Sequence, residues 1–539
     1  MLIIAGAAVI ARNPRPVHWH GLDIVVLFLS SVPFLQLTAG MLPFSGVAWV
    51  GTAYLLGFLL ILLVGAHWEM AEPGGVGNGL FLAIGIAALL SIGLQLREWL
   101  GVTWDSDSLQ IWSATFTPGR PSANLGQPNQ LATILIWALL GCAWGVVRHK
   151  VRPVLAILFA VLVIFGIALT QSRIALVSLV SVTLAVWWWR RFFSACAPWV
   201  VTSLLIYFLV CIFSLQAISD FLGLDVQIRS ASMGGESTHL RLTAYRIFGD
   251  AVWQKPLWGY GWNQLVVAQL SVAQDHPAVG AFFVQSHNLF LDFLLWFGVP
   301  TGVFLSTYII YWWIRCVVHV KNLQDILLVM FVLVVGLHAM VELPLHHAYL
   351  LLPTGLVIGA LNQRMNKRVI WASSRWPVWG IGLGACLLLA VIMRDYLQID
   401  ESFRTIRLES AHIGRLPPGK PPEVLVLNDL RELIYSARLE VKPDINADDM
   451  ERLRKVTLSF PTPYNLFNLA KALAFRHRPE DARLLIQKMQ KAEPDGYDLD
   501  MHRIWDSQAR NQPAMAAVRW PALEVNPVKS PNLQNPLAR

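Results

Sequence analysis

Long apolar stretches dominate this chain and limit what it can fold into. Segments of nearly uninterrupted apolar residues, each near the ~20 residues that cross a hydrocarbon core as a helix, recur along its first three quarters. The chain is 55% hydrophobic and only 14% charged, more apolar than a soluble chain of 539 residues. The sequence predicts an all-α polytopic membrane protein with about 11–12 transmembrane helices. The predicted spans are 21–40, 46–66, 78–98, 129–147, 152–170, 174–190, 198–218, 288–314, 323–341, 346–361 and 377–394, with a shorter apolar segment at 2–11.

Basic residues in the short loops predict the orientation of these spans, because Lys and Arg are retained in the cytoplasm. They recur in alternate loops: Arg148, Lys150 and Arg152; Arg190 and Arg191; Arg315 and Lys321; Arg364, Lys367, Arg368 and Arg375. Segments 99–128 and 219–287 and the chain after about residue 395 then lie on the opposite, exported side. The loop 67–77 fits least well, because it should be cytoplasmic yet contains Glu69 and Glu72 and no Lys or Arg.

The net charge and the cysteines exclude other classes of protein. The net charge of +8 comes largely from the anchoring loops, so it does not indicate a nucleic-acid partner. All five cysteines lie in or beside predicted spans, so no disulfide framework is expected in the exported parts. The sequence contains no HExxH, paired CxxC, Walker loop or nucleophile elbow, which leaves metalloprotease, ATPase and serine-hydrolase functions without support.

The last quarter of the chain is charged and carries apolar residues at helical spacing on either side of a break at Arg478–Pro479. Two amphipathic helices in this arrangement are typical of a tetratricopeptide-like repeat, and one or two repeats bury little by themselves. We therefore expect a small helical domain that leans on the membrane part. The predicted domains are a transmembrane catalytic domain (1–394) with a large periplasmic loop (219–287), a periplasmic helical TPR-like domain (395–515) and a disordered tail (516–539).

Three polar motifs stand at span edges on the exported side, where an ionisable or amide group costs a few kcal/mol unless it faces protein, water or a ligand. They are Gln127, Asn129 and Gln130 in ANLGQPNQLATIL, Arg173 in TQSRIA, and His287 with Asn288 in VQSHNLFLDFLLWFGVP. Taken singly, the amides and the histidine are ordinary helix caps, and the arginine is an ordinary interfacial residue. Asp292 follows His287 by five residues, so a regular helix does not place the two side chains together.

Two further motifs fall on the same side. Arg241 and Arg246 begin an amphipathic segment, which is typical either of an interfacial helix or of a site for a phosphorylated lipid. The stretch HAMVELPLHHAYLLLP places Glu342, His346, His347 and Tyr349 around a turn, and Pro344 argues against a helical metal-binding pair there. Because all five motifs share one side, together they predict chemistry on a lipid-borne, phosphate-bearing donor at the outer leaflet.

The segments NLGQPNQLAT, LTQSRIA, SHNLFLDFLLWFGVP and HAMVELPLHHAYLLLP resemble the signatures of the PglL-type O-oligosaccharyltransferases. These belong to a superfamily with the O-antigen ligases and Wzy polymerases, and the resemblance covers roughly residues 20 to 365. It implies a GT-C-type fold and transfer of a preassembled glycan from undecaprenyl diphosphate to Ser or Thr of an exported protein such as a pilin. The expected partners are this lipid-linked donor, the exported acceptor and membrane lipids of the bacterial inner membrane, without a cofactor.

The resemblance also implies roles for single residues. His287 matches the essential histidine of the family, Arg173 and Arg241 match the arginines that hold the diphosphate, and Gln127 and Gln130 fall in the amide motif that contacts the donor. The other substrate-binding candidates are Asn288, Arg246, Glu342, His346 and Tyr349. A serine hydroxyl needs a base near neutral pKa, and guanidinium groups stabilise a leaving diphosphate, so a metal-independent inverting displacement is expected.

Three other functions compete with this one. One is a scaffold role for the tail with a degenerate membrane part, which the five polar motifs on one side argue against. An O-antigen ligase or Wzy-type polymerase would use the same donor with a sugar hydroxyl as the acceptor. A flippase or transporter would require polar residues at mid-span on several helices and an internal repeat, and neither is evident in the sequence.

Overall fold

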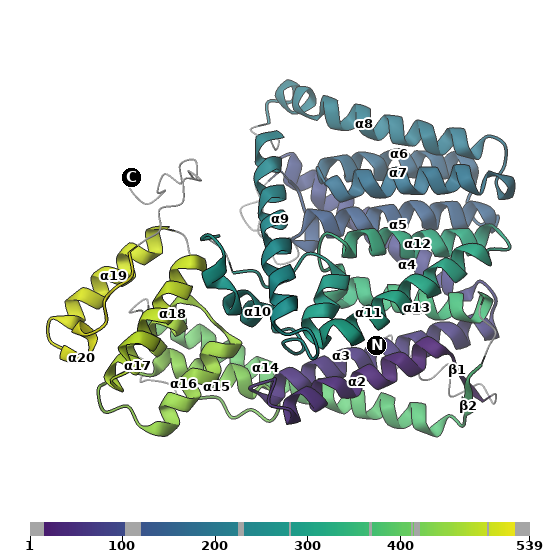
Figure 1. Cartoon of the computed structure of the whole chain (residues 1–539). Helices are drawn as coiled ribbons and strands as arrows, with labels where there is room; N and C mark the ends of the chain where they lie inside the picture. Colours follow the sequence, from purple (N-terminus) through teal and green to yellow (C-terminus); the bar gives the residue numbers. More distant parts are fainter. Residues whose placement is uncertain are drawn as a thin grey trace.

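Eleven apolar helices form the main body of the computed structural model, and they run side by side in Figure 1. The structure describes residues 16–102, 120–224, 231–279, 282–365, 369–410, 413, 421–492 and 495–522; the predicted segment at 2–11 and most of the predicted disordered tail lie outside these residues. The helices are α2 (Gly21–Thr38), α3 (Ser45–Ala71), α4 (Gly75–Trp99), α5 (Pro128–Val147), α6 (Pro153–Leu169), α7 (Arg173–Trp188), α8 (Ala197–Phe221), α11 (Leu289–Val318), α12 (Leu323–Ala339), α13 (Ala348–Met365) and α14 (Trp376–Ser410).

The all-α membrane prediction is confirmed. Seven of these helices (α2, α3, α4, α5, α8, α11 and α14) are long and apolar enough to cross a membrane, and α6, α7 and α12 are shorter apolar helices. Within the described residues, β1 (Val17–Trp19) and β2 (Trp371–Ser373) are the only strands, and they pair antiparallel. Helix starts follow local chemistry: proline occupies the first turn of α5, α6 and α8, while polar side chains cap α5, α7, α11 and α12.

The loop 67–77, which contains Glu69 and no Lys or Arg, is paired with an arginine from a distant part of the chain. Glu69, at the end of α3, accepts a hydrogen bond from Arg364 of α13 at 2.5 Å. The same guanidinium donates to Asp325 at the start of α12 at 2.6 Å. Three helix ends therefore meet in one ion-paired group, and a buried carboxylate is tolerated there because it is paired.

The loop between α8 and α11 folds across the ends of the membrane helices. It contains α9 (Ala231–Gln254), α10 (Leu265–Ser271) and the short η4 (Ala273–Asp275). In Figure 1, α9 runs nearly perpendicular to α5, α6 and α7 at their ends. The helix buries Ala244, Ile247, Phe248 and Ala251 against α10 and the start of α11, so its apolar face fixes it in place.

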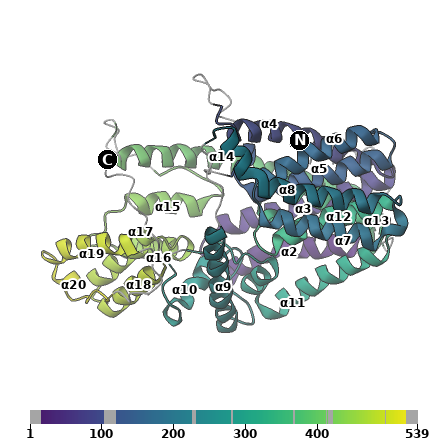
Figure 2. The same ribbon diagram turned by 90° about the horizontal axis from the view of Figure 1, so that it is seen from above.

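The tail forms a separate group of helices to one side of the bundle in Figure 2. They are α15 (Asn428–Arg438), α16 (Ala447–Ser459), α17 (Pro463–Phe475), α18 (Pro479–Ala492), α19 (Asp495–Ala509) and α20 (Pro513–Ala516). The two helices predicted around Arg478–Pro479 are α17 and α18. The tail contacts the membrane part, because the amide of Val279 donates to the carbonyl of Lys491 at 2.9 Å and that of Gly46 to Asn428 at 2.8 Å. The predicted domain boundary at 394–395 falls inside α14, which continues unbroken to Ser410.

Helix α11 is broken at Gly298, which has φ 80° and ψ 170°. The loop after α9 satisfies the backbone on both sides of this break. The amide of Val299 donates to the carbonyl of Pro256 at 2.6 Å, and the amide of Tyr260 donates to the carbonyl of Leu295 at 2.7 Å. Backbone groups at membrane depth need such partners, so the loop and the broken helix stabilise each other.

Replacing Gly298 with alanine is expected to destabilise the protein by about 1–3 kcal/mol or more, because only glycine adopts this backbone conformation readily. A Cβ at this position would also collide with the Leu257 carbonyl. Thermal unfolding in detergent measures the effect. Gly336→Ala in α12 is the matched control, since a Cβ there meets nothing within 4 Å; equal unfolding midpoints for the two variants would contradict the assignment.

Candidate active site

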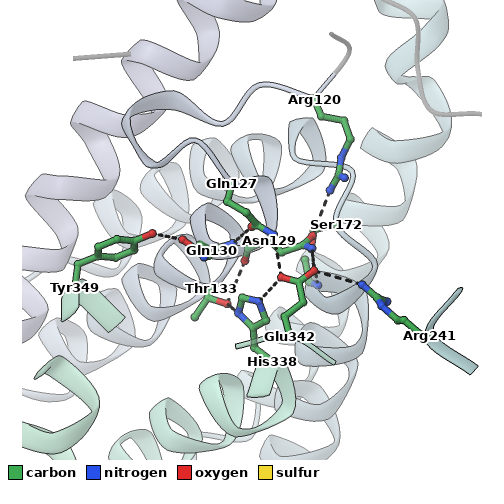
Figure 3. Close-up of polar contacts among 11 residues, drawn as sticks. Arg120, Gln127, Asn129, Gln130, Thr133, Ser172, Arg241, His338, Glu342 and Tyr349 are labelled. Carbon is green, nitrogen blue, oxygen red and sulfur yellow. Dashed lines mark hydrogen bonds and ion pairs between the residues drawn. The ribbon is translucent and has the colours of Figure 1, made fainter. Parts of the chain in front are cut away.

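The carboxylate of Glu342 lies at the centre of a group of hydrogen-bonding side chains at one end of the bundle (Figure 3). We call this group the polar cluster; its members are Gln127, Asn129, Thr133, Arg241, His338 and Glu342. Gln127 donates to Glu342 Oε2 at 2.9 Å, and Asn129 donates to Oε1 at 2.5 Å. Arg241 donates to Oε1 at 3.4 Å and thereby joins α9 to the turn between α12 and α13. Three of the five predicted motifs therefore meet at one carboxylate.

His338 holds Glu342 from within the bundle. This histidine is fully buried on α12, and its Nε2 lies 3.0 Å from Glu342 Oε2. Since an ionised carboxylate only accepts hydrogen bonds, Nε2 must carry a proton. The other nitrogen, Nδ1, lies 2.9 Å from the hydroxyl of Thr133 on α5. The chain Thr133–His338–Glu342 thus sets the position of the carboxylate that Arg241 contacts.

The amide motif both starts α5 and reaches the cluster. Gln127 is the N-cap of α5, and its side-chain oxygen accepts from the amide of Gln130 at 2.7 Å. Its side-chain nitrogen remains available to donate to Glu342, so one residue performs both tasks. Gln130 is buried and accepts a hydrogen bond from the hydroxyl of Tyr349 on α13. Both predicted glutamines therefore contact the turn 340–349 or the helix that follows it.

His287 stands immediately before α11 in the left-handed region, with φ 61°. Asn288 is the N-cap of α11, as predicted, and accepts from the amides of Phe290 and Leu291 at 3.0 and 3.2 Å. Tyr245, one turn after Arg241 on α9, donates to the carbonyl of His287 at 3.2 Å. The histidine is thus fixed between α9 and α11, and its Nδ1 is buried without a hydrogen-bond partner among the described residues.

Asp292 does not pair with His287. The carboxylate of Asp292 is fully buried and accepts the hydroxyl of Ser286 at 2.5 Å and the amide of the same residue at 3.3 Å. This contact ties the residue before His287 to the first turn of α11. It fits the prediction that the aspartate does not form a dyad with the imidazole, and gives it a part in shaping the strained backbone at His287.

The electrostatics of the site keep His287 neutral and Glu342 charged. Burial lowers the pKa of His287, and the nearby Arg241 charge lowers it further, outweighing the opposite effects of Glu342 and the Val341 backbone. Burial raises the pKa of Glu342, but hydrogen bonds from His338 and Asn129 and the Arg241 charge outweigh this and lower the pKa overall. A neutral imidazole is able to accept a proton, whereas this carboxylate is not suited to donate one.

The remaining predicted residues lie at or outside the edge of the cluster. Arg173 is the first residue of α7 and is exposed, directly after the N-cap Ser172 that Figure 3 draws beside the cluster. Arg246 is exposed and lies about 140° around α9 from Arg241, so the two do not share a face. His346 is also exposed, and its ring lies against that of Trp296 with centroids 6.0 Å apart. Among the described contacts, neither Arg246 nor His346 reaches the cluster.

Sequence reasoning missed three members of this site. His338 begins the motif HAMVELPLHHAYLLLP, but a histidine at the end of an apolar span is typical of an ordinary helix residue. Thr133 ends the quoted NLGQPNQLAT segment, but a single threonine in an apolar run does not indicate a role by itself. Arg120 lies in a loop and donates to Asn129 Oδ1 at 3.2 Å and to the carbonyl of Thr170 at 3.1 Å. In the part of the chain that the structure describes, no three His, Cys, Asp or Glu side chains gather as a metal site would require.

Two family models and two curated proteins are similar to this chain. Residues 133–306, which include His287 and Arg241, match the family described as O-Antigen ligase. Residues 326–499, which include Glu342, match the family described as Virulence factor membrane-bound polymerase, C-terminal. No solved structure matches the chain.

Two curated relatives come from Acinetobacter baylyi. The chain is 28% identical over 506 residues to a general O-oligosaccharyltransferase, an alignment that covers 90% of this chain and 86% of the relative. It is 27% identical over 370 residues to a ComP-specific O-oligosaccharyltransferase, covering 66% of this chain and 63% of that relative. These similarities support a PglL-type O-oligosaccharyltransferase, a glycosyltransferase similar to the O-antigen ligases and Wzy polymerases.

Proposed function

We propose that this protein transfers a preassembled glycan en bloc from undecaprenyl diphosphate to Ser or Thr hydroxyls of exported proteins such as pilins. The polar cluster then faces the periplasm, with the protein in the bacterial inner membrane. One observation carries the proposal: a neutral histidine and a guanidinium are fixed beside each other by α9 where it crosses the bundle ends. The names of the Acinetobacter relatives supply the reaction class, since both are O-oligosaccharyltransferases.

In this proposal His287 is the general base. It takes the proton of the acceptor hydroxyl while the oxygen attacks the anomeric carbon of the glycan. The bond from that carbon to the diphosphate oxygen breaks, and its electron pair leaves with the lipid diphosphate. The single displacement inverts the anomeric configuration.

Guanidinium groups hold the leaving group. Arg241 is 33% exposed, so one face of its fork is open to a ligand while the other contacts Glu342. Arg173 is the second candidate, from the exposed start of α7. Two arginines suit a diphosphate because each presents paired donors, and charge that grows on the leaving oxygen is stabilised without reorganisation. Gln127 and Gln130 at the start of α5, and Tyr349 of α13, are assigned to binding of the donor.

The test is glycosylation of a co-expressed pilin-like acceptor in a strain that makes a lipid-linked glycan. Intact-mass analysis should show the mass of one whole glycan added to the acceptor, and only when this protein is present. Retention of the anomeric configuration in the product would exclude the single displacement. Addition of single sugars one at a time would exclude en bloc transfer.

The second candidate is an O-antigen ligase or polymerase that uses a sugar hydroxyl as the acceptor. The match of residues 133–306 to the O-Antigen ligase family favours it, because the same base and arginines serve either acceptor. A deletion strain separates the two functions. Loss of the lipopolysaccharide ladder with normal protein glycosylation indicates the ligase or polymerase, whereas the reverse pattern indicates the oligosaccharyltransferase.

The pH dependence of transfer should follow the charge on His287. Because burial and Arg241 lower its pKa, activity should persist below the pH at which an ordinary histidine becomes protonated. Arg241→Gln removes a charge that lowers this pKa, so the acid limb of the rate profile should move to higher pH. Glu342→Gln removes a charge that raises it, so the limb should move to lower pH. Shifts of the same sign in both variants would argue against His287 as the titrating base.

A further inference from the structure

A cavity of about 310 Å³ lies at the end of the bundle opposite the polar cluster. Helix α11 contributes Tyr308, Tyr311, Trp312 and Arg315 to its wall, and α13 contributes Asn362 and Met365. Tyr308 and Arg315 are seven residues apart, so the cavity extends about 10 Å along α11 from its end into the bundle. Tyrosine and tryptophan are the residues that favour the boundary between lipid headgroups and acyl chains.

Among the described residues, Arg315 is a cation without a carboxylate partner. Its guanidinium donates to the hydroxyl of Tyr311 at 3.2 Å, and none of the ion pairs found among the described residues involves it. Arg364, at the same end of the bundle, contrasts with it, since Glu69 and Asp325 both bind that arginine at 2.6 Å or less. Carboxylates of the chain therefore neutralise Arg364, whereas Arg315 is able to pair with an anion that is not part of the protein.

The cavity wall also holds an unused donor. Asn362 is 2% exposed, and its side-chain oxygen accepts from Trp312 Nε1 at 2.7 Å. The side-chain nitrogen of Asn362 has no acceptor among the described residues. A buried amide without an acceptor is unfavourable, and a ligand oxygen would satisfy it. Asp23 is the carboxylate whose charge acts on Tyr308 of the cavity wall. It is buried, and it accepts a hydrogen bond from the backbone amide of His20.

We propose that this cavity binds the phosphate of an anionic phospholipid from the leaflet opposite the polar cluster. Arg315 pairs with the phosphate, the Asn362 amide donates to a phosphate or ester oxygen, and the aromatic wall packs against the glycerol and upper acyl chain. Basic pockets between membrane helices are suited to such headgroups, and the other basic loops at this end raise the local concentration of anionic lipid. The site is independent of glycan transfer.

The test uses the purified full chain in an uncharged detergent, titrated with phosphatidylglycerol, phosphatidylcholine or glycerol 3-phosphate. Retained lipid is counted by native mass spectrometry. Arg315→Gln should weaken phosphatidylglycerol binding by about tenfold or more, as expected for loss of a charge-assisted hydrogen bond. Met365→Trp fills the cavity without changing charge and should weaken it as well. Arg190→Gln, an exposed arginine in another loop at the same end, is the control and should bind as the wild type does.

The remaining outcomes overturn the proposal in distinct ways. Equal loss in Arg315→Gln and Arg190→Gln would mean that diffuse surface charge binds the lipid. Full binding by Met365→Trp would place the lipid outside this cavity. Glycerol 3-phosphate that binds as tightly as phosphatidylglycerol would make the ligand a soluble phosphate rather than a membrane lipid.

Discussion

His287→Ala is expected to reduce glycan transfer by about 10²–10⁴-fold, the usual contribution of a positioned general base. A serine hydroxyl is hardly ionised at neutral pH, so without a base the attacking oxygen carries a proton that it cannot lose easily. His287 is held in place on both sides. The hydroxyl of Tyr245 donates to the backbone carbonyl of His287, and Asn288 caps the helix that follows. Quantitative mass spectrometry of the acceptor, at matched levels of membrane protein, measures the loss.

Two companion variants separate lost chemistry from lost structure. His287 has φ 61°, which asparagine tolerates better than alanine, so His287→Asn keeps the backbone while removing the base. Both variants should lose transfer to the same extent, while His287→Asn should unfold closer to the midpoint of the unaltered protein than His287→Ala does. His276→Ala is the control, because this histidine lies in the same loop but contacts Asp250 at 3.1 Å. Near-normal transfer by His287→Asn would show that the backbone, rather than the imidazole, matters.

Glu342→Gln is expected to lower transfer at least about tenfold while the chain still folds. The carboxylate accepts hydrogen bonds on both oxygens, and a glutamine must present an NH₂ group to the donors on one side. Either Asn129 and Arg241 or Gln127 and His338 then lose their acceptor. Removing the charged partner of this half-buried pair lowers stability, and part of the effect is misplacement of Arg241.

The readout must distinguish a positioning role from a purely structural one. If Glu342 sets Arg241 for the diphosphate, the variant should show a raised KM for the lipid-linked donor and an acid limb moved to lower pH. Glu72→Gln, at the exposed end of α3, is the matched control. Unchanged kinetics together with a lowered unfolding midpoint would assign Glu342 to stability alone.

The spans could be predicted closely because their signal is local. The predicted 129–147 is α5 at Pro128–Val147, and 323–341 is α12 at Leu323–Ala339, since apolar length and capping residues determine both ends. The cation for Glu69 could not be predicted, because Arg364 is 295 positions away and only the packing of α3 against α13 brings them together.

The site could be predicted in part. Topology alone placed Gln127, Arg241 and Glu342 on one side, and the structure joins them directly. That Glu342 would be the common acceptor depends on helix tilt and on a 3.0 Å contact with His338, and neither follows from sequence spacing. Arg246 shows the limit in the other direction, because two nearby arginines on one helix point to different faces.

The break in α11 has a consequence for engineering acceptor range. Pro256 is hydrogen-bonded to Val299, and Tyr260 to Leu295, through their backbones. The loop that the proposal places in the periplasm and the broken helix therefore form one structural unit. A chimera that takes the loop from a relative but keeps α11 of this chain would disturb these backbone hydrogen bonds. Grafts should therefore exchange residues 240–300 as a unit, with junctions in α9 and after Pro300.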